Sequence, residues 1–183
     1  VTANLAGGVG IGKLSFNIAL SNVSITQLGL YAYTDPFYSS PVAGQSPNGQ
    51  IASTIASSSN PLIFAPSSPL EIPAGQTYYF ELRGNVIGAT SQSLASLTLL
   101  ADTLNAATLQ SGVVLQGKDS YFVWSPNSTS TSQLADPDWT NGYNIPGLGS
   151  AGIVQARLAT SYDPWASVAS VVVAIMRGLF FAR

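Results

Sequence analysis

The sequence predicts an all-β protein of one domain, an antiparallel β-sandwich of the Ig-like or jelly-roll-like kind with an apolar C-terminal extension. Three observations support this prediction. Apolar and polar residues alternate with a period of two in several segments, which is typical of half-buried strands. Turns rich in Gly, Pro and Ser separate these segments at short intervals. The last residues, 165–183, are almost wholly apolar although the rest of the chain is polar.

The first half of the chain contains four expected strands. Residues 1–12 are Gly-rich and predict a flexible or edge segment. Leu14, Phe16 and Ile18 then alternate with polar or small residues, which begins the strand pattern. The turn-rich stretch 39–49 separates the second strand from the third. The strands expected in this half span residues 13–20, 23–33, 50–57 and 61–64.

The second half contains the clearest strand, residues 76–86, which follows the turn Pro73-Ala74-Gly75. A helical turn is an alternative for part of residues 94–109, because Leu97, Leu100, Leu104 and Ala107 have helix-like spacing. Further strand candidates span residues 94–100, 113–115, 121–124 and 153–158. The resulting division is a Gly-rich segment at 1–12, a sandwich domain at 13–160 and an apolar assembly segment at 161–183.

The composition excludes several classes of protein. Charged residues make up 8% of the chain and the net charge is −2, so there is no basic surface for nucleic acid. The chain has no His and no Cys, which excludes disulfides, thiolate nucleophiles and metal sites that need those ligands. The 38 Ser and Thr residues give a surface hydrated by hydroxyl groups. With Val1 at the start, this composition predicts a secreted extracellular or cell-surface protein whose signal peptide has been removed.

Two motifs that bind ligands in other proteins are interpreted as structural. GGVGIGK at residues 7–13 matches a phosphate-binding loop, but Leu14 follows it instead of Ser or Thr and the next residues alternate like a strand. Asp136 and Asp138 lie in a polar loop and are weak calcium candidates, because no complete calcium-loop pattern surrounds them. We therefore expect no cofactor.

Catalysis is also not expected. Without His or Cys, an acid–base site would need carboxylates, a Lys or a Tyr. Most of the eight carboxylates stand beside turns or on the outward faces of expected strands. A Ser nucleophile activated by Lys13 or Lys118 has no supporting motif, and a carboxylate pair of the glycosidase kind cannot be located from sequence.

Aromatic and glycosylation motifs have both a structural and a functional interpretation. Trp124, Trp139 and Tyr143 are interpreted first as packing residues of the sandwich. Trp139 and Tyr143 together could instead form an aromatic platform for sugar rings. Asn22 and Asn127 each begin an N-x-[ST] sequence and are candidate glycosylation sites.

Three sequence segments resemble a known module: LYAYTDPFYSSPV at 30–42, IPAGQTYYFELRGNV at 72–86 and FVWSPNSTSTSQLADPDWTNGYNIPGL at 122–148. In this order they are similar to the repeated β-sandwich module of large secreted surface proteins of Patescibacteria. The resemblance covers roughly residues 13–158. It implies an extracellular structural part, and it does not extend to the tail after about Thr160.

The tail has several interpretations. A transmembrane helix is disfavoured because the apolar stretch is short and Arg177 interrupts it. A helix would place Val168, Val171, Val172, Ile175 and Leu179 on one face, whereas the Val triplet and the Phe pair favour a strand. As a strand it is apolar on both sides, which is typical of burial on both sides. The tail could be the last strand of its own sandwich or could complete the sheet of a neighbouring subunit.

We expect a structural subunit that assembles with copies of itself into a filament or surface layer by donor-strand addition of the tail, with Asp163-Pro164 as a stiff hinge. The expected assembly residues are Trp165, Val168, Val171, Val173, Ile175, Leu179, Phe180 and Phe181. The alternatives are a carbohydrate or cell-wall binding module that uses Trp139 and Tyr143, and a membrane-anchored surface domain.

Overall fold

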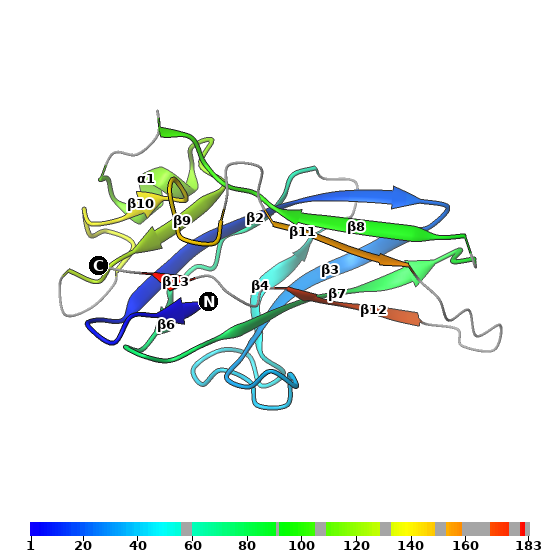
Figure 1. The fold of residues 1–183 in the computed structure, drawn as a ribbon, viewed down its shortest axis with the longest axis horizontal. Coiled ribbons are helices and arrows are strands. Elements are labelled where there is room, and N and C mark those ends of the chain that lie inside the picture. Colours follow the sequence, from blue (N-terminus) through cyan, green and yellow to red (C-terminus); the bar gives the residue numbers. More distant parts are fainter. Residues whose placement is uncertain are drawn as a thin grey trace.

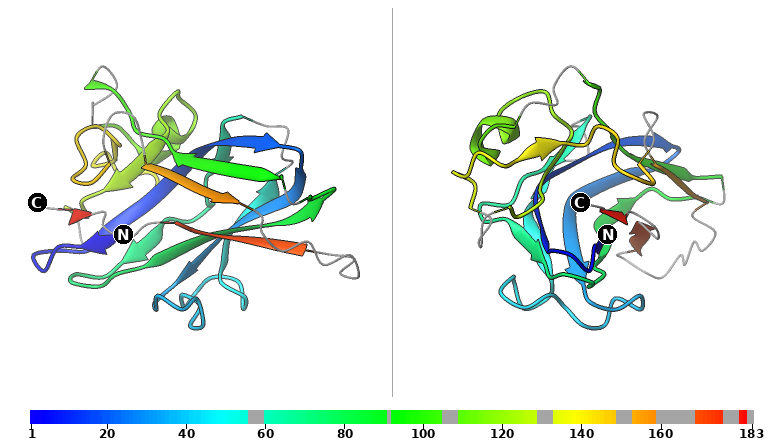
Figure 2. Two further views of the ribbon diagram at one scale, coloured as in Figure 1. Left: turned by 45° about the vertical axis from the view of Figure 1, so that its right-hand side comes forward. Right: turned by 60° about the vertical axis from the view of Figure 1, so that its left-hand side comes forward.

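The chain folds into two antiparallel sheets that pack against each other, which confirms the predicted all-β sandwich (Figure 1). The computed structural model describes residues 1–55, 60–90, 92–104, 109–128 and 133–148. It also describes the backbone of three further strands at residues 153–158, 169–175 and 180–181. The two further views show the sheets twisting across one another around a common interior (Figure 2).

The first sheet is organised around its longest strand, β2 (Val9–Ser21). Four other strands pair directly with it, two of them with the first half of β2 on one edge. These four strands are β5 (Leu62–Phe64), β6 (Leu70–Ile72), β8 (Leu94–Leu99) and β9 (Phe122–Ser125). The short strand β10 (Thr140–Asn141) extends the sheet beyond β9, and β11 (Ile153–Leu158) extends it beyond β8.

The second sheet has four strands in the order β12 (Ala169–Ile175), β7 (Tyr79–Ile87), β3 (Ser24–Tyr33) and β4 (Gln50–Ile55). A small parallel pair joins segments from opposite ends of the chain, β1 (Thr2–Ala3) and β13 (Phe180–Phe181). Thr2 also bridges to Thr77, and the backbone nitrogen of Val1 donates to the carbonyl of Tyr78 at 2.8 Å. The first and last strands therefore lie side by side (Figure 2).

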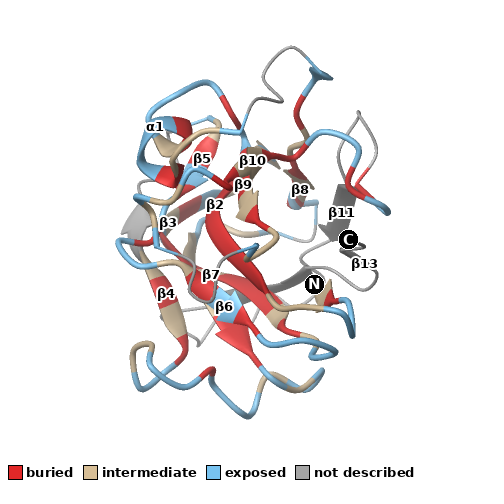
Figure 3. Ribbon diagram, turned by 90° about the vertical axis from the view of Figure 1, so that its left-hand side faces the viewer, coloured by how far each residue is buried: buried red, intermediate tan, exposed pale blue. Residues whose placement is uncertain are grey.

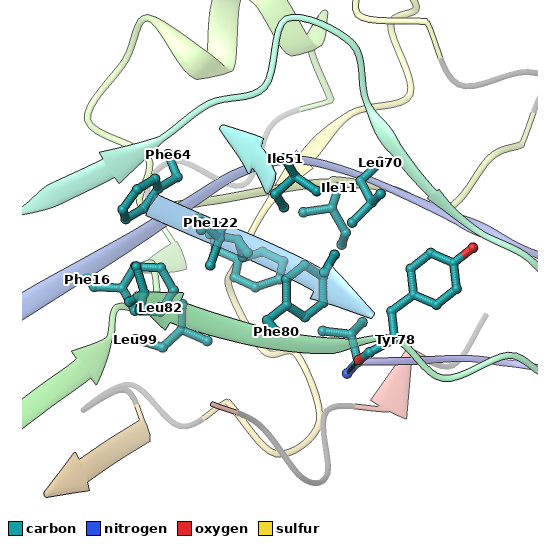
Figure 4. Close-up of a cluster of buried hydrophobic side chains, with 14 of the residues drawn as sticks. Ile11, Phe16, Ile51, Phe64, Leu70, Tyr78, Phe80, Leu82, Leu99 and Phe122 are labelled. Carbon is teal, nitrogen blue, oxygen red and sulfur yellow. Dashed lines mark hydrogen bonds between the residues drawn. The ribbon is translucent and has the colours of Figure 1, made fainter. Parts of the chain in front are cut away.

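Apolar side chains from both sheets fill the interior between them (Figure 4). Phe16 of β2 and Phe64 of β5 meet edge to face, with ring centroids 5.9 Å apart. Phe80 of β7 and Phe122 of β9 are fully buried in the same cluster. Colouring by burial shows that the buried residues run along β2 and β7 in the middle of the sandwich (Figure 3). The expected alternation of burial is seen in β8 and in the second half of β2, whereas residues 9–16 of β2 are buried on both faces.

The structure differs from the sequence predictions in several places. Residues 113–115 were predicted as a strand but lie in the short helix α1 (Gly112–Gln116), which begins because the Oγ of Ser111 accepts the Val114 N–H at 3.4 Å. Residues 1–12 were predicted as a flexible or edge segment, but they contribute buried side chains to the core and form the start of β2. The short strands β6 and β10 are not among the strands that the sequence predicted. The helical alternative within 94–109 is wrong for residues 94–99, which form β8.

Candidate functional sites

The C-terminal strand β12 lies at an edge of the second sheet and pairs antiparallel with β7. Successive residues of β12 alternate between two sets of register partners on β7. Three of them, Val171, Val173 and Ile175, stand opposite the buried β7 positions Gly84, Leu82 and Phe80. The other partners of β7, Glu81, Arg83 and Asn85, stand opposite Ala174, Val172 and Ser170. The strand interpretation of the tail therefore holds for residues 169–175, in the same chain's own sheet.

Of the other expected assembly residues, the structure describes only some. Phe180 and Phe181 form β13, which pairs with β1. Trp165, Val168 and Leu179 lie outside the described residues. No helix of the described part of the chain is long and apolar enough to span a membrane.

An ion pair lies on the face of β7 that alternates with the core positions. Arg83 donates from Nε to Oε2 of Glu81 at 2.8 Å, and its Nη2 lies 2.6 Å from the same oxygen. The guanidinium also lies over the rings of Tyr31 and Tyr33, at 4.7 and 5.5 Å from their centroids. Glu81 is only 2% exposed, so its charge needs this partner. The ion pair and the two tyrosine rings therefore hold the side chains of Glu81 and Arg83 in place on β7, the strand that pairs with β12.

Trp139 is a packing residue. Its side chain is 0% exposed, and its Nε1 donates to the carbonyl of Gln133 at 2.8 Å. The ring fits against two glycines, because a Cβ on Gly12 or on Gly112 would lie 2.9 or 3.0 Å from ring atoms. The sugar-platform interpretation of Trp139 is therefore wrong for this fold, since the protein itself covers the ring. Tyr143 is 42% exposed and remains available.

Trp124 also has a structural role. Its indole is partly buried against the core, and Nε1 donates to the carbonyl of Asn141 at 3.0 Å. The bond links β9 to β10, next to the register pair between Trp124 and Thr140. The packing interpretation of this residue is thus confirmed.

Asp102 connects three segments that are distant in sequence. Its carboxylate accepts backbone hydrogen bonds from Tyr121 at 2.7 Å, Phe122 at 3.0 Å and Gly142 at 2.8 Å. Sequence reasoning grouped Asp102 with solvated carboxylates, but it is buried. It also lines a surface hollow of about 660 Å³, together with Tyr143 and the turn that follows it. No local spacing could have shown this, because its partners lie 19 to 40 residues away.

Lys13 is a buried structural cation. It is 3% exposed, and Nζ donates to the carbonyls of Gln116 and Lys118, each at 3.0 Å. Desolvation lowers the pKa of Lys13, although the charges of Asp102 and Asp119 oppose this. The GGVGIGK motif continues into β2 and so does not form a phosphate loop.

The calcium candidates act as acceptors within their loop. Oδ2 of Asp138 accepts from the backbone N–H and the hydroxyl of Ser128 at 3.0 and 2.9 Å. Oδ2 of Asp136 accepts from the backbone N–H of Gln133 at 2.9 Å. Within the described residues, no three His, Cys, Asp or Glu side chains converge as metal ligands would.

The two candidate glycosylation sites differ in their surroundings. Asn22 is exposed in the turn between β2 and β3 and has a positive φ of 54°. Asn127 is half-buried, and its Nδ2 donates to Oε2 of Glu71 at 2.6 Å. A glycan on Asn127 would have to replace this hydrogen bond.

Comparisons with protein-family models, with curated proteins and with solved structures found no match. Function must therefore be argued from the sites themselves.

Proposed function

We propose that this chain is an extracellular structural subunit that assembles with copies of itself by exchanging its C-terminal segment. In the assembly, β12 of one copy pairs with β7 of the next copy in the register that it has in its own sheet. The observation that carries the proposal is the position of β12: an edge strand near the end of the chain that forms a seven-residue ladder with β7. The extracellular location rests on the hydroxyl-rich composition.

The ladder is suited to exchange because the bonds are the same in either arrangement. Backbone hydrogen bonds and register pairs would be identical whether β12 comes from the same chain or from a neighbour, which is the usual basis of domain swapping. The alternating partners on β7 favour one register, since a slip by one residue would place β12 residues opposite the wrong face.

The connection before β12 is long enough for transfer. Residues 159–168 join β11 to β12 and include Asp163-Pro164. Fully extended, these ten residues span about 33–36 Å. A compact chain of this length has a radius of gyration of about 16 Å, so the span is comparable to the width of one subunit. Head-to-tail exchange propagates a filament when the rotation between neighbouring subunits does not close into a ring.

A cysteine pair tests the proposal directly, because the natural chain has no Cys. Ser170 and Asn85 are register partners across β12 and β7, and paired residues in antiparallel strands have Cβ atoms at a distance that oxidation can bridge. The double variant Ser170→Cys, Asn85→Cys is oxidised under assembly conditions and separated on a non-reducing gel. We expect a ladder of covalent multimers.

The control is the double variant Thr26→Cys, Asn85→Cys, which joins β3 and β7 at another register pair. Both strands lie within the body of the sandwich, so this variant should give only internal disulfides. If the Ser170 variant also gives only internal disulfides in assembled material, strand exchange is wrong. Deleting residues 165–183 should abolish assembly, and fibres of unchanged form from the truncated chain would equally contradict the proposal.

A further inference from the structure

The hollow beside Asp102 has the features of a small ligand site. It lies between the buried carboxylate and the turn formed by residues 143–148. Its volume of about 660 Å³ falls within the range of 300–1,000 Å³ that is usual for small-molecule sites. Nothing in the proposed assembly uses this hollow, because β12 pairs on the other sheet.

The walls of the hollow are held in place by internal hydrogen bonds. Oδ1 of Asn141 accepts the Tyr143 N–H at 3.2 Å, and the Leu148 N–H donates to the Ile145 carbonyl at 3.0 Å. Ile145 and Leu148 are buried and anchor the turn in the core. Tyr143 remains exposed at the same site, so the hollow combines a fixed backbone with an accessible aromatic ring.

Asp102 provides a positioned acceptor. A carboxylate has about four acceptor positions, and three of those of Asp102 are used by backbone N–H groups. Among the described residues, Oδ2 takes two of these bonds and Oδ1 takes one, which leaves Oδ1 one acceptor position that no described residue fills. The three N–H donors also offset the charge of the carboxylate. The remaining acceptor position therefore suits a hydroxyl group better than a second full ion pair.

The chemistry of the lining selects the class of ligand. No Lys or Arg is among its described residues, so the described lining offers no cationic partner for a phosphate, a sulfate or an acidic sugar. Tyr143 presents an aromatic surface, Asn144 an amide and Asp102 an acceptor. A neutral sugar has complementary groups, because its C–H faces pack on aromatic rings and its hydroxyls donate hydrogen bonds. We propose that this hollow binds a neutral saccharide, with the ring packed on Tyr143 and one hydroxyl donated to Asp102.

The test uses the full chain and a panel of defined disaccharides. Cellobiose, maltose, mannobiose and N,N′-diacetylchitobiose are the neutral probes, and digalacturonic acid is the anionic one. Binding is followed by titration calorimetry and by amide NMR shifts. We expect at least one neutral disaccharide to bind and to shift the signals of residues 143–148. Tyr143→Ala should weaken that binding about tenfold, the equivalent of one aromatic contact.

Matched variants separate binding from folding. Tyr143→Phe keeps the ring and should keep most of the affinity. Phe37→Ala removes another exposed aromatic, 85% exposed on the β3–β4 connection, and should leave affinity unchanged. The proposal is overturned if no neutral probe binds, if Tyr143→Ala binds as tightly as the natural chain while melting at the same temperature, or if digalacturonic acid binds more tightly than the neutral sugars.

Discussion

Replacing Trp139 with alanine should destabilise the fold by about 3–5 kcal/mol, the usual cost of deleting a large buried aromatic side chain. The indole is fully buried against Gly12, Gly112 and Leu134. Its hydrogen-bond partner, the carbonyl of Gln133, belongs to an exposed residue, so water can replace that bond. The cost therefore comes from the cavity. For a chain of this size it corresponds to a fall in melting temperature of roughly 6–20 °C.

Urea denaturation followed by circular dichroism measures this change, with an unchanged m-value as the check that both variants unfold alike. A second substitution tests the cause. Gly12→Ala places a Cβ 2.9 Å from the Trp139 ring, which should cost about 1–3 kcal/mol by overpacking. In the Trp139→Ala background that penalty should disappear. A loss below about 1 kcal/mol for Trp139→Ala, or additive effects in the double variant, would refute the packing role.

Three further predictions concern other contacts. Asp102→Asn replaces an acceptor of three N–H bonds and should cost at least about 1.5–3 kcal/mol in the same urea assay; a neutral effect would contradict its linking role. Gly84→Ala brings a Cβ within 2.6 Å of Ile25 and should cost about 1–3 kcal/mol in thermal melts; an unchanged melting temperature would mean that β7 and β3 adjust freely. Desolvation raises the pKa of Asp35, but hydrogen bonds from Ser40, Phe37 and Ser39 outweigh it, so the pKa is lowered overall. The hydrogen bonds to Asp35 should keep residues 35–40 fully ordered above the unfolded pKa of about 3.9, and this order should be lost as pH falls through the lower folded value. Amide NMR should show no such pH dependence for Asp35→Asn. Identical titration of both proteins would count against this linkage.

The period-two pattern was sufficient to predict most strands. Leu14, Phe16 and Ile18 alternate with polar or small residues in the sequence, which marked the strand although residues 9–16 of β2 are buried on both faces. The Gly-rich residues before them hid the true start of the strand, since glycine composition indicates flexibility while Gly12 is required by the ring of Trp139. Val113 to Leu115 had the composition of a strand, and the capping Ser111 was the available signal for a helix.

The candidate sites were less predictable than the fold. Trp139 was correctly interpreted as packing, but its sugar-binding alternative failed because burial depends on distant chain segments such as Gly12 and Gly112. Asp102 was missed for the same reason, as its hydrogen bonds come from residues at the start of β9 and the end of β10, which the fold brings together.

The position of β2 sets the order in which backbone amides should become accessible to deuterium. Because β2 pairs with β5, β6, β8 and β9, its hydrogen bonds cannot open without separating most of the first sheet. Amides such as that of Leu14 should therefore exchange only by global unfolding. β12 pairs with β7 alone among the described strands, so its amides should exchange through a smaller local opening. The protection of the β12 amides measures the free energy that holds the C-terminal strand in place, and its gap to that of Leu14 shows how much smaller the local opening is.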